Sequence, residues 1–430
     1  MKTNVKKMVS SGGVFLASLL FFQAAVFPQN VISPYSQKQI DESVENYFSS
    51  LTESEKLSQL FLINIEGNRK YFPVEKSELI QNLENENEPA YLVPGGCLLF
   101  SYNISSSPQQ LIEYINSIYE YSVSQGNVPP YIAVDQEGGL VNRLKEVTSY
   151  LPSQNRVAQS LSPQKAHELY ELQALQMKYL GFNMNLAPVS EAVNSSNQEF
   201  LGSRSFGNTS DCAVYSIAAV SAYQKHSIAC TVKHFPGNTN TDPHTGLPEI
   251  TLSEEELRTD CFNPFYYIFL ASPECVLMSH ARTSSYDSLT PACLSSLWIN
   301  DLLKKKLNFT GLVISDDIFM AALAENGFPP ETAAVKAIEA GVDIIMLSEK
   351  RFAHVGKILL EKSMSDENFK DKIEKSVKKV LAYKVKCGIL AVTLNEKNCL
   401  TLLPAKPCTS YEEYRKYYNY GVEFYNENFK

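Results

Sequence analysis

The chain has 430 residues, of which 44% are hydrophobic and 20% are charged, and this composition is typical of a folded globular protein. Its formal net charge of −9 argues against a nucleic-acid partner, because binding to phosphates requires a concentrated basic surface, which the sequence lacks. Nine cysteines, an odd number, do not suit a disulfide framework, although a pair between Cys399 and Cys408 is left open. No cysteine or histidine spacing predicts a metal site.

The first predicted element is an export segment over residues 1–28. Its lysine-rich head, MKTNVKK, is followed by an apolar run over residues 14–27, and this order is the pattern of a secretory signal. We therefore expect an exported protein, either periplasmic or held on the outer side of the inner membrane if the segment is retained as an N-terminal anchor. Membrane anchoring is expected from this segment only, because no later run approaches the roughly 18 apolar residues of a membrane-spanning helix.

Residues 29–390 repeat one pattern, in which a short apolar run is followed by a longer amphipathic segment. Short runs rich in valine, isoleucine and leucine are typical of parallel strands that are buried on both faces. The eight runs are FLINI (61–65), GCLLF (96–100), YIAVD (131–135), NMNLAPV (183–189), CTVKHF (230–235), CVLMSH (275–280), LVISD (312–316) and DIIML (343–347). Gly181 and Gly341 are expected to end two of the intervening helices.

Eight strands that alternate with helices predict an α/β fold, a (β/α)8 TIM-type barrel that forms a single catalytic domain. An open doubly wound sheet is the alternative, but it usually carries a glycine-rich phosphate turn after its first strand, which this sequence lacks. Residues 391–430 form a C-terminal extension. We expect its YEEYRKYYNYGVEFYNENF stretch to be a helix that packs an aromatic face on the barrel exterior, with sugar stacking or partner binding as the alternative role.

Polar residues collect where the predicted strands end. Asp135 ends the third strand, Lys233 and His234 end the fifth, and Asp316 and Asp317 end the seventh. In a barrel of this type the chemistry takes place at the C-terminal ends of the strands. The sequence therefore predicts that these side chains converge on one mouth.

The stretch KHFPGNTNTDPHTGLPEI, residues 233–250, adds an Asp-x-His pair on the loop after the fifth strand. Hydrolysis at an acetal carbon requires a carboxylate that attacks the anomeric carbon and a proton donor for the leaving oxygen. Asp316 is the candidate nucleophile. His244 can donate and then accept a proton near neutral pH, and Asp242 would orient its ring.

Four further residues are candidates for binding a substrate at the same mouth. Arg143, Arg204 and Lys233 would bind hydroxyl and carbonyl groups, because all three are cationic hydrogen-bond donors. Asp135 would accept hydrogen bonds from hydroxyl groups.

Other polar residues near the strand ends have structural interpretations. Asp317, and Asp316 taken alone, fit the N-cap of a following helix. Glu137, with the two glycines that follow it, fits a turn. We interpret His280 as a hydrogen-bonded histidine at the barrel mouth rather than as a catalyst.

Together these motifs resemble glycoside hydrolase family 3, in particular its β-N-acetylhexosaminidase branch. The matching stretches follow the family order from about residue 55 to about residue 390. They are AVDQEGGLVNRL, NLAPVSEAVN, SRSFGNT, KHFPGN with DPHTGLP, LMSHARTSSYDSLTPACLSS, GLVISDDIFMAAL and AIEAGVDIIML. KHFPG together with Asp-x-His is the most specific of them.

The resemblance implies a retaining exo-glycosidase that removes terminal β-linked N-acetylglucosamine from peptidoglycan fragments or chitooligosaccharides. Asp316 would form a covalent aspartyl-glycosyl intermediate, His244 would act as acid and then as base, and Asp242 would support His244. The residues that match the family's positions for the terminal N-acetylglucosamine are Asp135, Arg143, Arg204, Lys233 and His234. Members of this family need no metal or organic cofactor, so we expect none.

The chain departs from the family pattern around the loop that carries the acid/base. Asn238 stands where the family usually has a second histidine, and the loop is shorter. Pro243 stiffens the turn between Asp242 and His244. Glu191 replaces the family's usual aspartate, and we expect its additional methylene to be absorbed locally.

Two classes of alternative stay open. Another exo-glycosidase of the family, a β-glucosidase or a phosphorylase, is the nearer one. β-Glucosidases of the family generally take the acid/base from a second domain, whereas here Asp-x-His lies within the barrel sequence, and a histidine acid/base suits a phosphorylase because it does not repel phosphate. The other alternative, motivated by the shortened loop and the extension, is an inactive sugar-binding surface protein.

Overall fold

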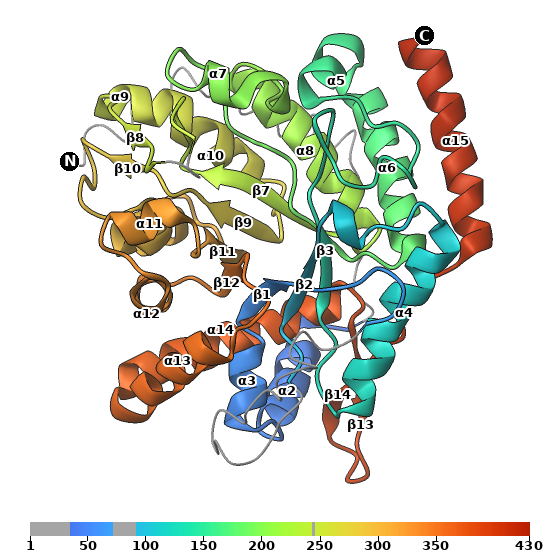
Figure 1. Cartoon of the computed structure of the whole chain (residues 1–430), viewed down its shortest axis with the longest axis vertical. Coiled ribbons are helices and arrows are strands. Elements are labelled where there is room, and N and C mark those ends of the chain that lie inside the picture. The colour runs from blue at the N-terminus through green and yellow to red at the C-terminus, as the bar shows by residue number, and fades with distance from the viewer. Residues whose placement is uncertain (1–34, 72–91, 243–245) are drawn as a thin grey trace.

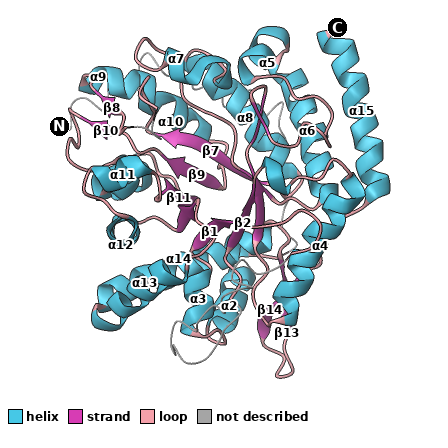
Figure 2. Ribbon diagram, viewed as in Figure 1, coloured by secondary structure: helices cyan, strands magenta, loops and turns pink. Residues whose placement is uncertain are grey.

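A computed structural model of the protein describes residues 35–71, 92–242 and 246–430. The expected export segment, 1–28, and the candidate acid/base His244 lie outside the described residues. Eight parallel strands close into a barrel in the order β1-β12-β11-β9-β7-β6-β3-β2, and helices surround it (Figures 1 and 2). This arrangement confirms the predicted (β/α)8 TIM-type barrel.

Each barrel strand lies on one of the eight predicted runs. The strands are β1 (Phe61–Asn64), β2 (Gly96–Leu99), β3 (Tyr131–Val134), β6 (Met184–Asn185), β7 (Ala229–Phe235), β9 (Cys275–Met278), β11 (Leu312–Asp317) and β12 (Ile344–Leu347). Strand β6 occupies only the beginning of its run, and β11 extends one residue beyond its own, to Asp317.

The remaining elements connect or follow the barrel strands. The helices are α2 (Gln37–Phe48), α3 (Glu53–Ser58), α4 (Pro108–Ser124), α5 (Gln154–Ser160), α6 (Pro163–Leu180), α7 (Gln198–Leu201), α8 (Thr209–Lys225), α9 (Glu254–Glu256), α10 (Asn263–Phe269), α11 (Ala321–Glu325), α12 (Pro330–Ala340), α13 (Ala353–Ser365), α14 (Glu367–Lys386) and α15 (Tyr411–Phe429). The small strands are β4 (Gln136–Gly138), β5 (Val141–Asn142), β8 (Glu249–Ile250), β10 (Arg282–Thr283), β13 (Leu390–Leu394) and β14 (Leu400–Pro404). The segments Leu257–Phe262 and Leu297–Lys306 are π-helical.

Local sequence signals set the ends of the helices. Helix α6 begins after Ser162, whose side chain accepts a hydrogen bond from the backbone N–H of Lys165, and it ends at Gly181 with φ of 106°. Helix α12 ends at Gly341 with φ of 102°. Glycine adopts this left-handed conformation without a steric penalty, so both glycines end helices as predicted.

The barrel strands are buried on both faces, and their side chains alternate between two clusters. Leu62, Leu98 and Ile314 belong to the cluster inside the barrel, whereas Ile63 and Val313 belong to the cluster between the strands and the helices. This alternation follows from the two-residue repeat of a strand. Burial on both faces explains why the strands read as continuous apolar runs in the sequence.

Helix α14 closes the N-terminal end of the barrel. The Nζ of Lys384 is fully buried there and donates hydrogen bonds to Oε1 of Gln59, at 2.6 Å, and to the carbonyl oxygen of Pro129, at 2.8 Å. Gln59 and Pro129 precede strands β1 and β3, so this lysine lies beneath the floor of the barrel. The opposite end, where the strands terminate, is left for the functional site.

The C-terminal extension forms the hairpin β13–β14 and helix α15, which lies against α6 (Figure 1). The ring of Tyr417 stacks on that of Tyr179, with 5.7 Å between the centroids. The hydroxyl of Tyr414 donates a hydrogen bond to the carbonyl oxygen of Val147 at 2.6 Å. The aromatic residues of this helix therefore fix it to the outside of the barrel.

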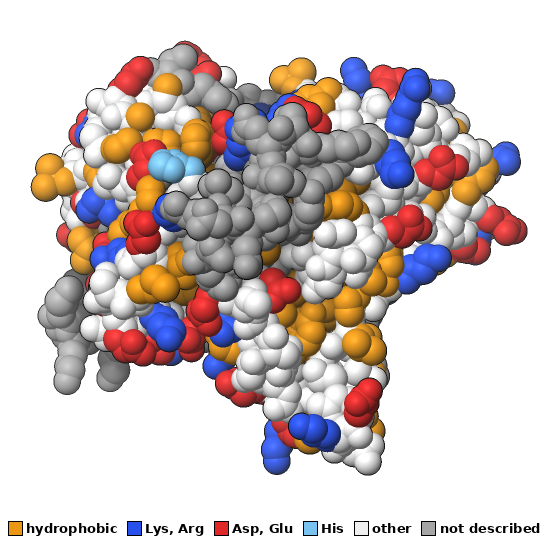
Figure 3. All heavy atoms as spheres, turned by 60° about the horizontal axis from the view of Figure 1, so that its bottom comes forward, with side chains coloured by type: hydrophobic (Ala, Val, Ile, Leu, Met, Phe, Trp, Pro, Cys, Tyr) orange, Lys and Arg blue, Asp and Glu red, His pale blue; other side chains and the backbone are white. Residues whose placement is uncertain are grey.

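All nine cysteines lie among the described residues and are free, and seven of them are buried. Cys399 and Cys408 are exposed and unpaired, so the pair that the sequence left open does not form. None of the described helices is both long enough and apolar enough to cross a membrane. On the face drawn in Figure 3, acidic and basic side chains are intermingled.

Candidate active site

A cavity of about 550 Å³ opens at the C-terminal ends of the barrel strands, opposite helix α14. Its charged and imidazole side chains are Asp135, Glu137, Arg143, Arg204, Lys233, His234, Asp316 and Asp317. Its aromatic side chains are Phe100, Phe200 and Phe319. Polar groups from the ends of β3, β7 and β11 thus meet in one cavity, although they are far apart in the sequence.

Four of these side chains form a buried ion-pair cluster on one side of the cavity. The Nζ of Lys233, which is 4% exposed, lies 2.7 Å from Oδ1 of Asp135 and 2.7 Å from Oε1 of Glu137. Nε and Nη2 of Arg204 donate to the two carboxylate oxygens of Glu137, each at 2.9 Å. This bidentate geometry and the shared lysine hold all four side chains in place.

The ion pairs keep the cluster charged despite its burial. Burial raises the pKa of the Glu137 carboxyl, but the Lys233 ammonium and the Arg204 guanidinium together lower it to about 2. Burial lowers the pKa of Lys233, yet the neighbouring Asp135 and Glu137 hold it above its ordinary value. Glu137 is therefore an ionised anchor for two cations, and its interpretation as a turn residue was incomplete. The sequence signal that could have indicated this role is the pair of acidic residues, Asp135 and Glu137, two positions apart directly after β3.

Arg143 borders the same cavity with an unused donor. Its Nε is buried, and among the described residues it has no hydrogen-bond partner. A buried donor without a partner costs free energy, which a ligand oxygen placed there would recover. This position is consistent with the predicted role of Arg143 in substrate binding.

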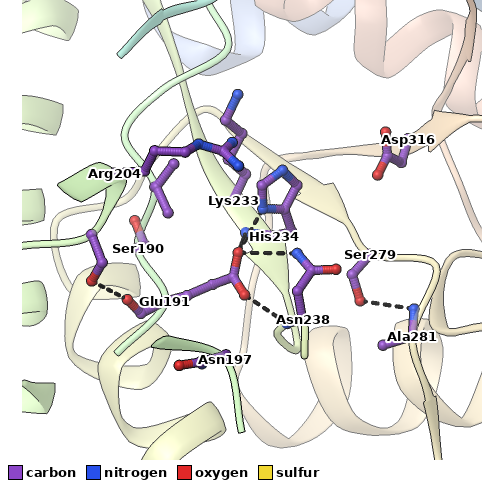
Figure 4. Close-up of polar contacts among 12 residues, drawn as sticks. Ser190, Glu191, Asn197, Arg204, Lys233, His234, Asn238, Ser279, Ala281 and Asp316 are labelled. Atoms are coloured by element: carbon purple, nitrogen blue, oxygen red, sulfur yellow. Dashed lines mark hydrogen bonds and ion pairs between the residues drawn. The ribbon is translucent and has the colours of Figure 1, made fainter. Parts of the chain in front are cut away.

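A second buried carboxylate, that of Glu191, fixes His234 (Figure 4). Its Oε1 lies 2.6 Å from Nδ1 of His234 and accepts a hydrogen bond from the His234 backbone N–H at 3.2 Å. Its Oε2 accepts from the backbone N–H of Asn238 at 2.6 Å, and Nδ2 of Asn238 donates to Oε1 at 3.2 Å. With Nδ1 held by the carboxylate, Nε2 is the nitrogen of His234 that is left for a ligand.

Glu191 and Asn238, two of the residues that depart from the family pattern, therefore contact each other. The longer side chain of Glu191 is not simply absorbed, because its carboxylate joins His234 to the first residues of the loop after β7. This pairing was missed in the sequence, since the two positions are 47 residues apart.

Asp316 lies at the end of β11, and Figure 4 shows it across from His234, Lys233 and Arg204. Its φ of 67° is in the left-handed region that residues other than glycine seldom adopt. The Asp316 Oδ1 accepts the backbone N–H of Asp317 at 2.8 Å, whereas its Oδ2 has no hydrogen bond within the described residues. An unusual backbone conformation that presents a carboxylate oxygen to a cavity is typical of a functional position.

The neighbouring Asp317 has a different role. Its Oδ1 accepts hydrogen bonds from the backbone N–H groups of Phe319, at 3.0 Å, and Ser348, at 2.9 Å. The N-cap of the following helix, α11, is Met320, so the capping interpretation of Asp317 was wrong. Its carboxylate instead ties together the loops that follow β11 and β12.

His280 is fully buried behind Asp316. Its Nδ1 lies 3.2 Å from Sγ of Cys293, and its Nε2 lies 3.8 Å from Oδ2 of Asp316. This Nε2 has no hydrogen-bond partner within the described residues, so the interpretation of His280 as a hydrogen-bonded histidine holds for Nδ1 but not for Nε2. The imidazole is directed at the candidate nucleophile.

The loop that carries the predicted acid/base leaves β7 next to this cavity. Asp242 is exposed, and its carbonyl oxygen accepts the backbone N–H of Gly246 at 3.1 Å. The start of the loop is anchored by Asn240, whose backbone N–H donates to the carbonyl oxygen of Ser196 at 2.7 Å. His244 lies outside the described residues, so its position relative to Asp316 stays a prediction.

The chain is similar in sequence and in fold to known proteins. A β-hexosaminidase of Methylococcus capsulatus is 30% identical over 259 residues, which cover 59% of this chain and 75% of that protein. Beta-hexosaminidase A of Pseudoalteromonas piscicida is 28% identical over 297 residues, 64% of this chain and 48% of that protein. This chain therefore spans about half the length of the Pseudoalteromonas protein.

Solved structures give a similar result. A glycoside hydrolase family 3 β-N-acetylglucosaminidase from Paenibacillus superposes with a TM-score of 0.70 at 27% identity, over 87% of this chain and 69% of that one. A fungal multi-domain family 3 β-N-acetylglucosaminidase gives a TM-score of 0.73 at 26% identity, over 87% of this chain but only 43% of the fungal one.

The family model of the glycosyl hydrolase family 3 N-terminal domain matches residues 52–383, which include every barrel strand and all the cavity residues named above. The resemblance found in the sequence motifs is thereby confirmed, and the chain belongs to glycosyl hydrolase family 3.

Proposed function

We propose that the protein is a retaining exo-β-N-acetylglucosaminidase. The observation that carries this proposal is the cavity in which Asp316 presents a carboxylate oxygen that accepts no hydrogen bond from the described residues, across from the ionised cluster around Lys233. Family membership and the names of the relatives, several of which are β-hexosaminidases or β-N-acetylglucosaminidases, support the same activity. We propose peptidoglycan fragments or chitooligosaccharides as its substrates.

In the proposed mechanism, the terminal sugar binds between Asp316 and the ion-pair cluster. Asp316 Oδ2 attacks the anomeric carbon and forms a covalent glycosyl ester, while the bond to the leaving oxygen breaks and His244 protonates that oxygen. His244, supported by Asp242, then removes a proton from water, which attacks the same carbon and releases Asp316.

The cluster and its neighbours would hold the sugar in the reactive orientation. Asp135 and Lys233 offer an acceptor and a donor to adjacent hydroxyl groups, and Nε2 of His234 offers a further contact. Arg204 and the unpaired Nε of Arg143 suit an acetamido carbonyl or a hydroxyl oxygen. Such fixed contacts contribute to catalysis by positioning the reacting atoms.

The nucleophile can be tested by covalent trapping. Incubation with an activated 2-fluoro sugar, followed by proteolysis and mass spectrometry, should place the label on Asp316. The Asp316→Ala variant should take up no label and should lose hydrolysis of nitrophenyl β-N-acetylglucosaminide. A label on another residue, or unchanged hydrolysis by the variant, would show that the proposed mechanism is wrong.

The alternatives are separated by the choice of substrate and acceptor. Preference for nitrophenyl β-glucoside would identify a β-glucosidase, and a sugar phosphate formed only when phosphate is present would identify a phosphorylase. An unmodified protein that binds N-acetylglucosamine without hydrolysing either glycoside would be a sugar-binding protein.

We also propose that the protein is exported, on the basis of the basic head and apolar run in residues 1–28. Fractionation of expressing cells should find the protein outside the cytoplasm. Replacing Leu19 and Leu20 by arginine should retain it inside, because the apolar run would be interrupted. Full recovery of the unmodified protein in the cytoplasm would contradict export.

A further inference from the structure

Two loops that border the cavity meet at its rim. Phe100, after β2, and Ser348, after β12, both line the cavity. Two residues further along each loop, Tyr102 and Lys350 lie side by side, with Nζ of Lys350 5.9 Å from the centre of the Tyr102 ring. The backbone N–H of Ser348 donates to Asp317, so this rim is connected directly to the strand that carries the candidate nucleophile.

The aromatic surface of the cavity continues outward onto Tyr102. The rings of Phe100 and Tyr102 are parallel, with an angle of 5° between their planes and 6.0 Å between their centroids. Tyr102 is 52% exposed. A large exposed ring beside a polar cavity indicates a binding surface, because an aromatic side chain combines an apolar face with a polar tip.

The loop that presents Tyr102 is held rigidly. The backbone N–H of Phe100 donates to Oδ1 of Asn103 at 2.8 Å. The buried amide Nδ2 of Asn103 donates in turn to the carbonyl oxygens of Ile65, at 3.0 Å, and Gly67, at 2.9 Å. A ligand that stacks on Tyr102 would therefore meet a preorganised surface, and little conformational entropy would be lost on binding.

A charged pair lies next to the same ring. Nζ of Lys350 is 2.7 Å from Oε1 of Glu66, and both side chains are partly exposed. The pair offers hydrogen-bond donors and acceptors while its charges compensate each other. Such a surface suits the hydroxyl groups of a neutral sugar better than an isolated positive or negative charge would.

We propose that Tyr102, Lys350 and Glu66 form a second sugar subsite, which binds the sugar on the leaving-group side of the scissile bond. Its ligand is a neutral β-linked pyranose, the next unit of a chitooligosaccharide. This inference rests on the proposed function, since a terminal sugar enclosed at the ion-pair cluster must direct its leaving group toward the rim.

The subsite is tested with two substrates that share the terminal sugar. Methyl β-N-acetylglucosaminide has a leaving group too small to reach Tyr102, whereas chitobiose places a whole sugar there. Tyr102→Ala should lower kcat/KM for chitobiose by about tenfold and leave the value for the methyl glycoside within about twofold. Tyr102→Trp keeps an aromatic face and should retain cleavage of chitobiose.

Tyr150→Ala is the matched control. Tyr150 is 49% exposed and packs against Tyr425 of α15, and it does not line the cavity. This variant should leave both substrates unaffected. An equal change for both substrates in Tyr102→Ala, or no change for either, would overturn the subsite.

The compensated charge can be tested separately. Glu66→Gln leaves Lys350 as an uncompensated cation, which should attract a carboxylated second sugar such as muramic acid. The ratio of kcat/KM for a disaccharide with that sugar to kcat/KM for chitobiose should therefore be several-fold higher in the variant than in the parent. An unchanged ratio would exclude this pair from the subsite. If the unmodified protein does not cleave even the methyl glycoside, the proposed function is wrong.

The subsite can still be tested in that case by calorimetric titration with chitobiose. Tyr102→Ala should then weaken the binding of chitobiose, and an unchanged affinity would contradict the subsite.

Discussion

The carboxylate of Glu191 holds two residues of the candidate site, His234 and Asn238, and this role was not evident from the sequence. It binds the ring and backbone of His234 with one oxygen and the backbone of Asn238 with the other. It does not line the cavity, so it acts on a substrate through His234 and Asn238, which do. A carboxylate in this place determines which nitrogen of His234 is available and where the loop after β7 begins.

The role of Glu191 in positioning predicts the effect of Glu191→Gln. The amide keeps the size of the side chain but can no longer accept hydrogen bonds with both of its terminal atoms. We expect kcat/KM for a β-N-acetylglucosaminide to fall roughly tenfold to hundredfold, mainly through KM, because His234 loses its orientation. Glu199→Gln, an exposed change on α7, serves as control. Unchanged kinetics with Glu191→Gln would contradict this role.

His280 leads to a different kinetic prediction. Its Nε2 faces Oδ2 of Asp316 and no part of the ion-pair cluster that we expect to bind the sugar. We therefore expect His280→Asn to lower kcat by roughly tenfold with little change in KM, because the carboxylate loses the neighbouring imidazole, which we expect to donate to it as the covalent intermediate breaks down. Steady-state and burst kinetics would measure this.

Cys293→Ser is the control for the His280 prediction. The serine hydroxyl can replace the thiol beside Nδ1 of His280, at the position where Sγ now lies 3.2 Å away. This variant should stay within about threefold of the parent. A rise in KM as large as the fall in kcat in His280→Asn would instead indicate general damage to the cavity.

At the scale of elements, the barrel strands could be predicted and the contacts between their loops could not. A buried parallel strand can be predicted from its own residues, as in the run LVISD that forms most of β11, because its first four residues are all buried. Glu137 and Arg204 are 67 residues apart, and their ion pair depends on how the segments that follow strands β3 and β6 meet. No local sequence pattern shows which distant side chains will form an ion pair or hydrogen bond. Asp316 and Lys233 could be predicted because they end strands, whereas the roles of Glu137 and Glu191 depend on distant partners and were not predicted.

Helix α15 gives a prediction about stability at the same scale. Tyr414 is buried against the barrel, and its hydroxyl binds the carbonyl oxygen of Val147. Tyr414→Ala should lower the free energy of unfolding by about 3 kcal/mol, through lost packing and the lost hydrogen bond. Tyr414→Phe should lower it by about 1 kcal/mol.

Chemical denaturation followed by circular dichroism would measure both Tyr414 variants. Tyr420→Ala, at an exposed position of α15, should change stability by less than about 0.5 kcal/mol. If Tyr414→Ala were as mild as this control, the packing of α15 would contribute nothing to the stability of the barrel.

For the whole molecule, the two ends of the barrel differ in how their buried charges are compensated. The cavity end gathers charges that balance each other, whereas at the floor the ammonium of Lys384 donates to the uncharged oxygens of Gln59 and Pro129. Burial lowers the pKa of Lys384 to about 7, and Cys97 acts in the opposite direction. The unfolded chain, with an ordinary lysine pKa near 10.5, therefore binds this proton more readily than the folded chain between about pH 7 and pH 10.5.

This difference predicts that Lys384 destabilises the fold most at or below about pH 7, and progressively less as the pH rises toward 10.5. Lys384→Met removes this ionisable group. The melting temperature of the variant minus that of the parent should therefore be largest near pH 6 and should be smaller at pH 10. Lys375→Met, at an exposed site of α14, should show no such trend. A pH-independent difference for Lys384→Met would contradict the buried titration.

The near balance of charge in the cavity has a consequence for the encounter with substrate. Four carboxylates, of Asp135, Glu137, Asp316 and Asp317, face three cations, of Arg143, Arg204 and Lys233. Opposite charges this close cancel within a few ångströms, so hardly any field extends into the surrounding solvent. An uncharged glycan is then captured by shape and diffusion alone, and the association rate should be nearly the same in dilute buffer and in concentrated salt.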